Sequence, residues 1–370
     1  LSLSVQMKIQ YHDLLYFLAE KPSKELLSEK LFQLGHEHEI DGDIFEMELT
    51  PNRGDCLSLI GLSRELNIFF GSSDALKYYD DDIDSLEIEF KNDSPNDCPK
   101  ISFLEIEIES DISDYKPYLE NYFLLSGTNK TNLFTDVSNY ISYELGQPTH
   151  CFDSEKIDGE LIFANKLCNC SFKTLLGSKI SLNDNNCVFT VADEIVSLAG
   201  IMGGASTSCS INTKKVLVEC AYFNSESIIG KAIKYNLNSD AAYKFERGVD
   251  YENHDLVLRR FIKIISEHAN IASIKIKSFN FQELQKKYIP LNVKKINKTL
   301  GIDIEELEYL KILNKLNFVI ENNQILVPTY RNDISTQNDL AEEVARVIGY
   351  NNIENSRISL PQPKTNNVIN

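Results

Sequence analysis

An acidic, turn-rich segment at residues 72–100 divides this chain and constrains its fold more than any other feature. Two polar runs, 80–84 and 92–97, enclose one predicted alternating strand at 86–90. Charged and turn-forming residues of this kind indicate a solvated linker. A chain of 370 residues is expected to hold two or three domains. We therefore expect one small domain before this linker and further domains after it.

Small α+β domains are predicted at both ends of the chain, at residues 1–71 and 287–352. In the first, helical patterns at 25–34 and 57–70 enclose an alternating strand at 44–49. The second combines a strand at 289–293, a hairpin through Asn322 and Asn323, and helices at 293–300, 305–316 and before Gly349. The polar tail, 353–370, is typical of a linker.

Residues 101–280 are predicted to form a central domain that mixes strands and helices. Strands are expected at 101–108, 195–201 and 216–220, and helices at 132–145 and 254–265. A glycine cluster at 200–204 permits either a close backbone approach to a ligand or a tight turn. The expected fold class is a multidomain α+β protein, with a central mixed α/β domain flanked by two small helix-rich α+β domains.

Composition excludes several classes of protein. The sequence has no run of 18 apolar residues, so no membrane span and no membrane partner are expected. Residues 1–6 lack the features of a signal peptide, and Met7 is the expected natural start. Eight scattered cysteines without a Cys-x-x-Cys pair indicate reduced thiols in a cytoplasmic protein. A net charge of −18 argues against a large basic surface that binds nucleic acid unaided.

Four carboxylates lie close together in residues 333–343. Asp339, Glu342 and Glu343 share one face of a predicted helix, and Asp333 precedes that helix. Like charges at this spacing repel, so either water solvates them or a cation binds them. Oxygen ligands without His or Cys suit Mg²⁺ or Ca²⁺. The residues alone leave both interpretations open.

Seven segments, taken together, resemble the β chain of bacterial phenylalanyl-tRNA synthetase. They occur in the family's order, at 46–65, 136–140, 144–153, 199–204, 219–223, 245–250 and 327–350. The chain departs from the family in two ways. It lacks the OB-fold tRNA-binding insertion after the first helix, and it ends before the catalytic-like and anticodon-binding modules. We therefore expect a natural short form, a gene fragment or a trimmed chain.

The resemblance implies an editing site in the central domain, which hydrolyses tRNA(Phe) mischarged with tyrosine. In the family the aminoacylation site lies in the α subunit. Glu219 matches the residue that accepts the tyrosine hydroxyl. His150 matches the editing histidine, which would orient water or hold the terminal adenosine near the ester, and Asn139 would help to position the water. The remaining predicted contacts to the substrate are Ser138, Pro148, Ala199 and Gly200. The alternatives are that Glu219 pairs with a Lys or Arg, that His150 is structural, and that the glycines only form a turn.

The resemblance also implies a Mg²⁺ site and defined partners. Asp333, Asp339, Glu342 and Glu343 match the family's metal positions, and that ion is shared with the α subunit. Mg²⁺ takes one or two direct carboxylates and keeps several waters. The expected partners are the α subunit, in an α₂β₂ assembly, and tRNA(Phe).

The leading interpretation is a β subunit that supports the α subunit and edits Tyr-tRNA. Two rivals remain: a non-catalytic assembly module for the α chain, and a free-standing editing factor. The acidic charge and the missing tRNA-binding parts favour the assembly module. A Mg²⁺-dependent phosphohydrolase is a more distant fourth, since no Gly-rich or Lys-rich phosphate cradle is apparent near the acidic helix.

Overall fold

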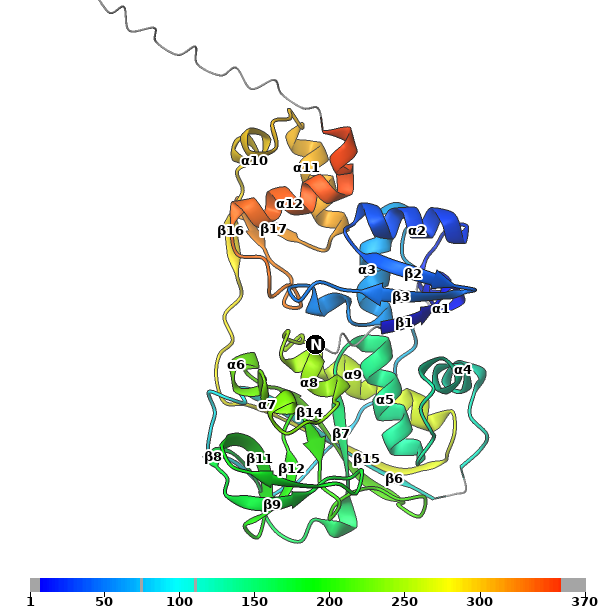
Figure 1. The fold of residues 1–370 in the computed structure, drawn as a ribbon, viewed down its shortest axis with the longest axis vertical. Coiled ribbons are helices and arrows are strands. Elements are labelled where there is room, and N and C mark those ends of the chain that lie inside the picture. The colour runs from blue at the N-terminus through cyan, green and yellow to red at the C-terminus, as the bar shows by residue number, and fades with distance from the viewer. Residues whose placement is uncertain (1–6, 74–75, 110–111, 354–370) are drawn as a thin grey trace, which may run out of the picture.

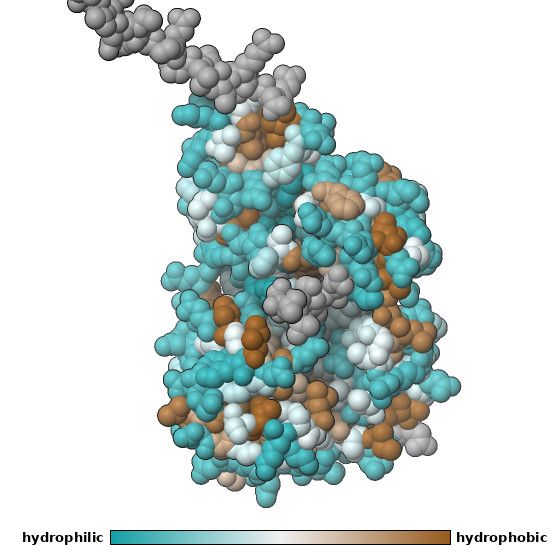
Figure 2. Space-filling model, viewed as in Figure 1, coloured by the Kyte–Doolittle hydropathy of each residue, from teal (hydrophilic) through white to brown (hydrophobic). Residues whose placement is uncertain are grey.

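The computed structural model describes residues 7–73, 76–109 and 112–353. They form an N-terminal, a central and a C-terminal unit (Figure 1). On the face shown in Figure 2, hydrophilic residues cover most of the surface, and apolar residues occur in separate small groups. No helix in the described parts of the chain is both long enough and apolar enough to cross a membrane.

The N-terminal unit packs three helices against an antiparallel sheet with the strand order β1-β3-β2. Its strands are β1 (Met7–Gln10), β2 (Glu37–Asp41) and β3 (Ile44–Glu48), and its helices are α1 (Tyr11–Phe17), α2 (Lys24–Gln33) and α3 (Leu59–Phe70). The Ser58 hydroxyl accepts a hydrogen bond from the Gly61 amide at 3.0 Å and caps α3, which ends at Gly71 with a φ of +69°. Both predicted helices are confirmed within a few residues.

The central unit contains two five-stranded sheets and one two-stranded hairpin. The first sheet has the order β4-β15-β6-β14-β7: β4 (Asp84–Ser85), β15 (Ile271–Asn280), β6 (Lys100–Ile108), β14 (Lys215–Tyr222) and β7 (Thr149–Asp153). The second has the order β13-β12-β11-β8-β5: β13 (Met202–Gly203), β12 (Glu194–Leu198), β11 (Asn185–Val191), β8 (Leu161–Leu167) and β5 (Phe90–Asn92). The hairpin pairs β9 (Cys170–Lys173) with β10 (Lys179–Leu182).

The predicted linker takes part in both large sheets, which corrects the expectation for residues 72–100. β4 pairs with β15 and β5 pairs with β8, both in parallel. Leu86 is buried, and the Phe90 ring lies 4.9 Å from the Phe103 ring. The alternating stretch within the polar runs supplies apolar side chains to the core, because those side chains lose contact with water when they pack there.

Six helices accompany the central sheets: α4 (Pro117–Ser126), α5 (Leu133–Leu145), α6 (Ser225–Ile228), α7 (Lys231–Lys234), α8 (Asp240–Phe245) and α9 (His254–Ser266). α5 and α9 cover one face of the first sheet. The opposite face packs on the second sheet. Successive residues of β14 therefore alternate between the two layers: Val216, Val218 and Cys220 face the helices, whereas Leu217 and Ala221 face the second sheet.

The C-terminal unit combines a sheet of the order β16-β18-β17 with three helices. These elements are β16 (Tyr288–Pro290), β17 (Val319–Glu321), β18 (Gln324–Leu326), α10 (Val293–Leu300), α11 (Glu306–Lys315) and α12 (Gln337–Ile348). Asn322 and Asn323 both have positive φ, at 48° and 61°, and form the predicted hairpin turn.

The two terminal units pack against each other beside the central unit (Figure 1). Ile68 of α3 belongs to the core of the C-terminal unit. Lys315 Nζ donates a hydrogen bond to the Ile68 carbonyl at 3.1 Å, and Gln33 Nε2 donates one to the Val347 carbonyl at 2.8 Å. The expected arrangement, in which separate small domains flank the centre, is thus replaced by one joint terminal block.

Candidate functional site

His150 and Glu219 are direct cross-strand neighbours in the first central sheet. Antiparallel pairing of β7 with β14 places the two Cα atoms opposite each other. Glu219 lies between Leu217 and Ala221 in the alternation, so its side chain faces the second sheet. His150 shares that side with Phe152, and their rings meet edge to face at 4.4 Å. Two polar side chains far apart in the sequence are thereby brought together inside an apolar layer.

Glu219 is buried and has no ion-pair partner in the part of the chain that the structure describes. Its exposed fraction is 4%. Burial alone raises the pKa of its carboxyl to about 8. At neutral pH the carboxyl is therefore mostly protonated, and it can both donate and accept a hydrogen bond. The alternative pairing with a Lys or Arg is not found among the described residues.

His150 is also uncharged at neutral pH. Burial lowers the pKa of its imidazole to about 4. Its Nε2 atom is buried without a hydrogen-bond partner in the described structure. A Cβ added at Gly203 would lie only 2.3 Å from His150 Cε1 and 2.8 Å from Leu175 Cδ2. Gly203 therefore packs closely against the ring, Leu175 lies close to Gly203, and a ligand can reach the buried Nε2 atom only when a neighbour moves.

The other predicted substrate contacts in the central unit, Ala199, Gly200 and Pro148, lie in different surroundings. Ala199 is fully buried in the layer between the sheets. Gly200 has a φ of +69°, and an added Cβ would lie 3.0 Å from the Phe223 ring. Pro148 is buried two residues before His150. The turn is therefore found at Gly200, where the chain packs against the Phe223 ring, and the predicted approach to a ligand stays a prediction.

Ser138 and Asn139 lie on α5, away from the His150 ring. The Ser138 hydroxyl donates to the Thr149 carbonyl at 2.7 Å. α5 packs on the Cys151 side of β7, where the Cys151 thiol contacts the Phe134 carbonyl at 3.4 Å. The His150 ring faces the other side of the strand. Asn139 is exposed, so the predicted placement of Asn139 beside His150 is not found.

The four carboxylates predicted to bind Mg²⁺ do not gather at one point. Arg331 donates to both oxygens of Asp333 at 2.9 Å, and it donates to Glu343 at 2.6 and 2.8 Å. Asp339 accepts the Ser335 and Thr336 amides at 2.7 Å and closes a capping box at the start of α12. Glu342 is exposed. Guanidinium or amide groups already donate hydrogen bonds to three of the four carboxylates, Asp333, Asp339 and Glu343. The arrangement therefore does not fit a cation site shared by all four.

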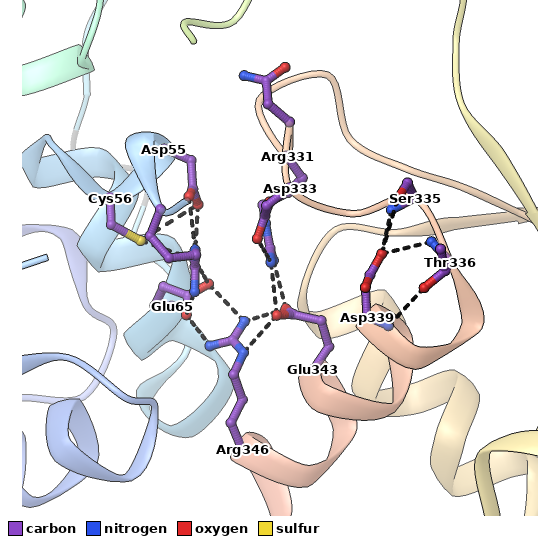
Figure 3. A network of polar contacts seen from close by, with 12 residues as sticks. Asp55, Cys56, Glu65, Arg331, Asp333, Ser335, Thr336, Asp339, Glu343 and Arg346 are labelled. Atoms are coloured by element: carbon purple, nitrogen blue, oxygen red, sulfur yellow. Dashed lines mark hydrogen bonds and ion pairs between the residues drawn. The ribbon is translucent and has the colours of Figure 1, made fainter. Parts of the chain in front are cut away.

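A buried ionic network joins the terminal units instead (Figure 3). Arg346 of α12 donates to Glu65 of α3 at 3.1 Å and to Glu343 at 2.9 Å. Arg53 contacts Glu65 at 2.9 Å and Asp55 at 2.9 Å. Burial opposes ionisation, but Arg346 and Arg53 hold the pKa of Glu65 well below its usual value.

The pairing across the network was not predicted from the sequence. Figure 3 shows it running from Asp55 and Glu65 through Arg346 to Glu343 and Asp333. One available signal was a charged residue at apolar helical spacing, since Glu65 lies between Leu62 and Leu66. His36, Cys56 and Glu65 also have ligand atoms within 4.8 Å of one another. Arg53 and Arg346 already bind Glu65, and their positive charges disfavour a cation there.

Comparison with known proteins defines the class of the chain. Residues 105–270 match the family model of the B3/4 domain, and residues 289–350 match that of the tRNA synthetase B5 domain. The central unit thus contains a B3/4 domain, and the C-terminal unit matches a tRNA synthetase B5 domain. Over 85% of its length the chain is similar to phenylalanine–tRNA ligase β subunits. It is 31% identical over 327 residues to the phenylalanine–tRNA ligase β subunit of Neisseria meningitidis serogroup A, and 32% identical over 324 residues to that of Burkholderia lata.

These alignments cover 85% of this chain but only 41% and 40% of the two relatives. The chain therefore spans about two fifths of their length. Its fold is similar to the crystal structure of an N-terminal fragment of the phenylalanyl-tRNA synthetase β subunit from Pyrococcus horikoshii, with a TM-score of 0.51 and 14% identity. That likeness covers 92% of this chain and 99% of the fragment. The mixed α+β architecture is confirmed at this level.

Proposed function

We propose that the central unit hydrolyses the ester of tRNA(Phe) mischarged with tyrosine, as part of a cytoplasmic phenylalanine–tRNA ligase. The observation that supports this most is the juxtaposition of buried Glu219 with part-buried His150, both uncharged at neutral pH, and with the buried His150 Nε2 atom left without a partner in the described structure. Buried polar atoms normally find hydrogen-bond partners, so an orphaned one in an apolar layer favours a ligand-binding role.

Glu219 would read the phenol hydroxyl of the substrate. An apolar pocket shaped for phenylalanine discriminates only about 10²-fold against an analogue that adds a hydroxyl, which explains the need for a second site. A site that hydrogen-bonds the hydroxyl rejects the analogue lacking it by roughly 10⁴–10⁵-fold, because its own polar group would remain unpaired. The protonated Glu219 carboxyl offers both a donor and an acceptor to a phenol.

His150 would orient the attacking water. A neutral imidazole nitrogen accepts a hydrogen bond from water and can receive its proton as the oxygen attacks the ester carbonyl. The ester C–O bond then breaks, releasing free tyrosine and the 3′ or 2′ hydroxyl of the terminal ribose, which takes up that proton. Asn139 has no part in this chemistry, because α5 packs on the other side of β7. The terminal block would serve as the contact region for the α subunit.

Deacylation assays test this assignment. The purified chain is expected to hydrolyse Tyr-tRNA(Phe) at least about 10²-fold faster than Phe-tRNA(Phe), and Glu219→Ala should reduce that ratio to below about tenfold. The matched control is Glu107→Ala, which changes an exposed glutamate on the neighbouring strand β6 and should leave the ratio unchanged.

Equal hydrolysis of the two aminoacyl-tRNAs by the unaltered chain would contradict the proposed recognition. Stable binding to an α subunit without hydrolysis of either substrate would instead favour the assembly module.

A further inference from the structure

Two lysines face each other on the β9–β10 hairpin without a counter-charge. Lys173 and Lys179 are direct cross-strand partners, and both are exposed. Side chains in this relation have Cβ atoms about 4.5–5.5 Å apart, and like charges there destabilise the sheet. Neither side-chain ammonium group forms an ion pair or a hydrogen bond within the described ranges. The hairpin therefore carries a local concentration of positive charge that nothing in the described fold offsets.

Two other cross-strand lysines of this acidic chain face carboxylates. Lys8 stands opposite Glu46 in the N-terminal sheet and forms an ion pair with it at 2.6 Å. Lys215 stands opposite Glu107 and pairs with the next carboxylate, Glu105, at 3.1 Å. Acidic residues outnumber basic ones by 55 to 37. A facing pair of lysines without any carboxylate is therefore a departure from the local pattern, and it favours an external anion.

The hairpin is fastened beside the His150–Glu219 site. The Ala205 amide donates to the Lys173 carbonyl at 3.0 Å, and the Leu175 amide donates to the Gly203 carbonyl at 2.9 Å. Phe172 and Thr174 are buried, whereas Lys173 and Leu175 alternate with them on the outer side. Lys173 therefore lies on the same side of the hairpin as Leu175. The Leu175 side chain lies close to Gly203, which packs against the His150 ring.

The tip of the hairpin is apolar and partly exposed. Leu175 is 40% exposed and Leu176 is 71% exposed. Leu175 also lies close to Gly203, which packs against the His150 ring, so we expect an entering ligand to pass beside Leu175. Lysines followed by leucines would complement a ligand that carries negative charge along its length and has an apolar face at its end. The single-stranded end of an RNA, with its phosphates and its terminal base, has this chemistry.

We propose that Lys173 and Lys179 bind the phosphate backbone of the single-stranded 3′ end of the tRNA, and that Leu175 and Leu176 contact its terminal nucleotide as it enters the His150–Glu219 site. The inference rests on the proposed function for the identity of the RNA. Phosphate between the two ammonium groups would convert their mutual repulsion into attraction. The lysines are thus positioning residues, and they take no part in the ester hydrolysis.

RNA binding and deacylation by the full chain together test the proposal. The probes are uncharged tRNA(Phe), for affinity as a function of salt, and Tyr-tRNA(Phe), for kinetics. The K173Q/K179Q double variant should bind tRNA at least about tenfold more weakly at 50 mM salt. The slope of log Kobs against log salt should decrease in magnitude by about 1.4, because each contact to single-stranded phosphate contributes about 0.7. For Tyr-tRNA, KM should rise about tenfold while kcat stays within twofold.

The matched control removes two positive charges from the same unit. Lys231 and Lys234 both pair with Asp184, at 2.9 and 2.8 Å. K231Q/K234Q should leave tRNA affinity within threefold of the unaltered chain. The thermal unfolding midpoint of K173Q/K179Q should be equal to or above that of the unaltered chain, since the substitution removes repulsion.

Any one of three outcomes overturns the proposal. The first is an unchanged tRNA affinity and salt slope in K173Q/K179Q, the second is an equal loss of tRNA affinity in both double variants, and the third is no detectable tRNA binding by the unaltered chain at 50 mM salt. Binding is measured without hydrolysis. A chain that binds tRNA through the lysines but spares Tyr-tRNA would therefore refute the proposed function and leave the lysine assignment standing.

Discussion

Replacing Glu65 with glutamine is expected to lower the free energy of unfolding by about 3–5 kcal/mol at pH 7. Glu65 is 4% exposed and lies between Arg53 and Arg346, with the His36 ring 3.3 Å away. The substitution removes one negative charge and leaves two guanidinium groups buried with fewer partners. Urea unfolding monitored by circular dichroism measures the change.

The control for this prediction is Glu46→Gln, which breaks the exposed pair with Lys8. Surface pairs contribute about 0–1 kcal/mol, so this variant should stay close to the unaltered chain. The pKa of Glu65 is lowered in the folded state, so its contribution is present above pH 4.5 and is lost as the pH falls towards the folded-state pKa. A loss below about 1 kcal/mol for Glu65→Gln would show that the network does not hold the terminal units together.

Glu219→Gln is expected to stabilise the protein increasingly as the pH rises. The folded carboxyl has a pKa of about 8 against 4.5 for the free group. The folded state therefore binds more protons than the unfolded state between these values, and the unaltered chain loses stability through this group across that range. Glutamine cannot ionise and escapes this loss. The advantage of the variant should reach on the order of 4–5 kcal/mol above pH 8 and vanish near pH 4.

His150 opposes this trend in part of the range. Its pKa is lowered from 6.5 to about 4, so its burial costs stability below pH 6.5 and nothing above it. The net slope from the two residues should therefore be small between pH 4.5 and 6.5 and clearly negative from pH 6.5 to 8. Chemical unfolding at half-unit pH steps, with Glu107→Gln as the exposed control, measures it. A pH-independent difference between Glu219→Gln and the unaltered chain would contradict a buried, neutral Glu219.

Much of the secondary structure was predictable because local pattern and burial agree in this chain. The helices that became α2, α3, α5 and α9 have apolar periodicity, and α3 and α5 end at glycines with positive φ. The exception is the segment 84–92, where one strand was predicted at 86–90 and the chain instead forms two short strands, β4 and β5, at the two ends of the segment. Their pairing with β15 and β8 is non-local, and neighbouring residues do not encode it.

The candidate site was predictable only in part. A residue-by-residue resemblance identified Glu219 and His150, and the register of β7 on β14 then confirmed that they are neighbours. Asn139 was predicted to lie beside His150 but lies on the other side of β7, because a position on a helix does not reveal on which side of a strand the helix packs. Asp333 and Glu343 were predicted to be free to bind a metal ion. Arg331 precedes Asp333 by 2 residues and Glu343 by 12, and it makes bidentate contacts to both carboxylates that only the folded chain reveals.

A crystal structure of the chain with a non-hydrolysable tyrosyl analogue of the tRNA 3′ adenosine tests the central claim most directly. We expect the phenol oxygen to lie roughly 2.5–3.0 Å from a Glu219 carboxyl oxygen. The acyl carbonyl should lie on the His150 side, with Leu175 displaced. An analogue seated elsewhere, such as the surface hollow beside Lys100 and Tyr251, or one whose phenol points away from Glu219, would contradict the account.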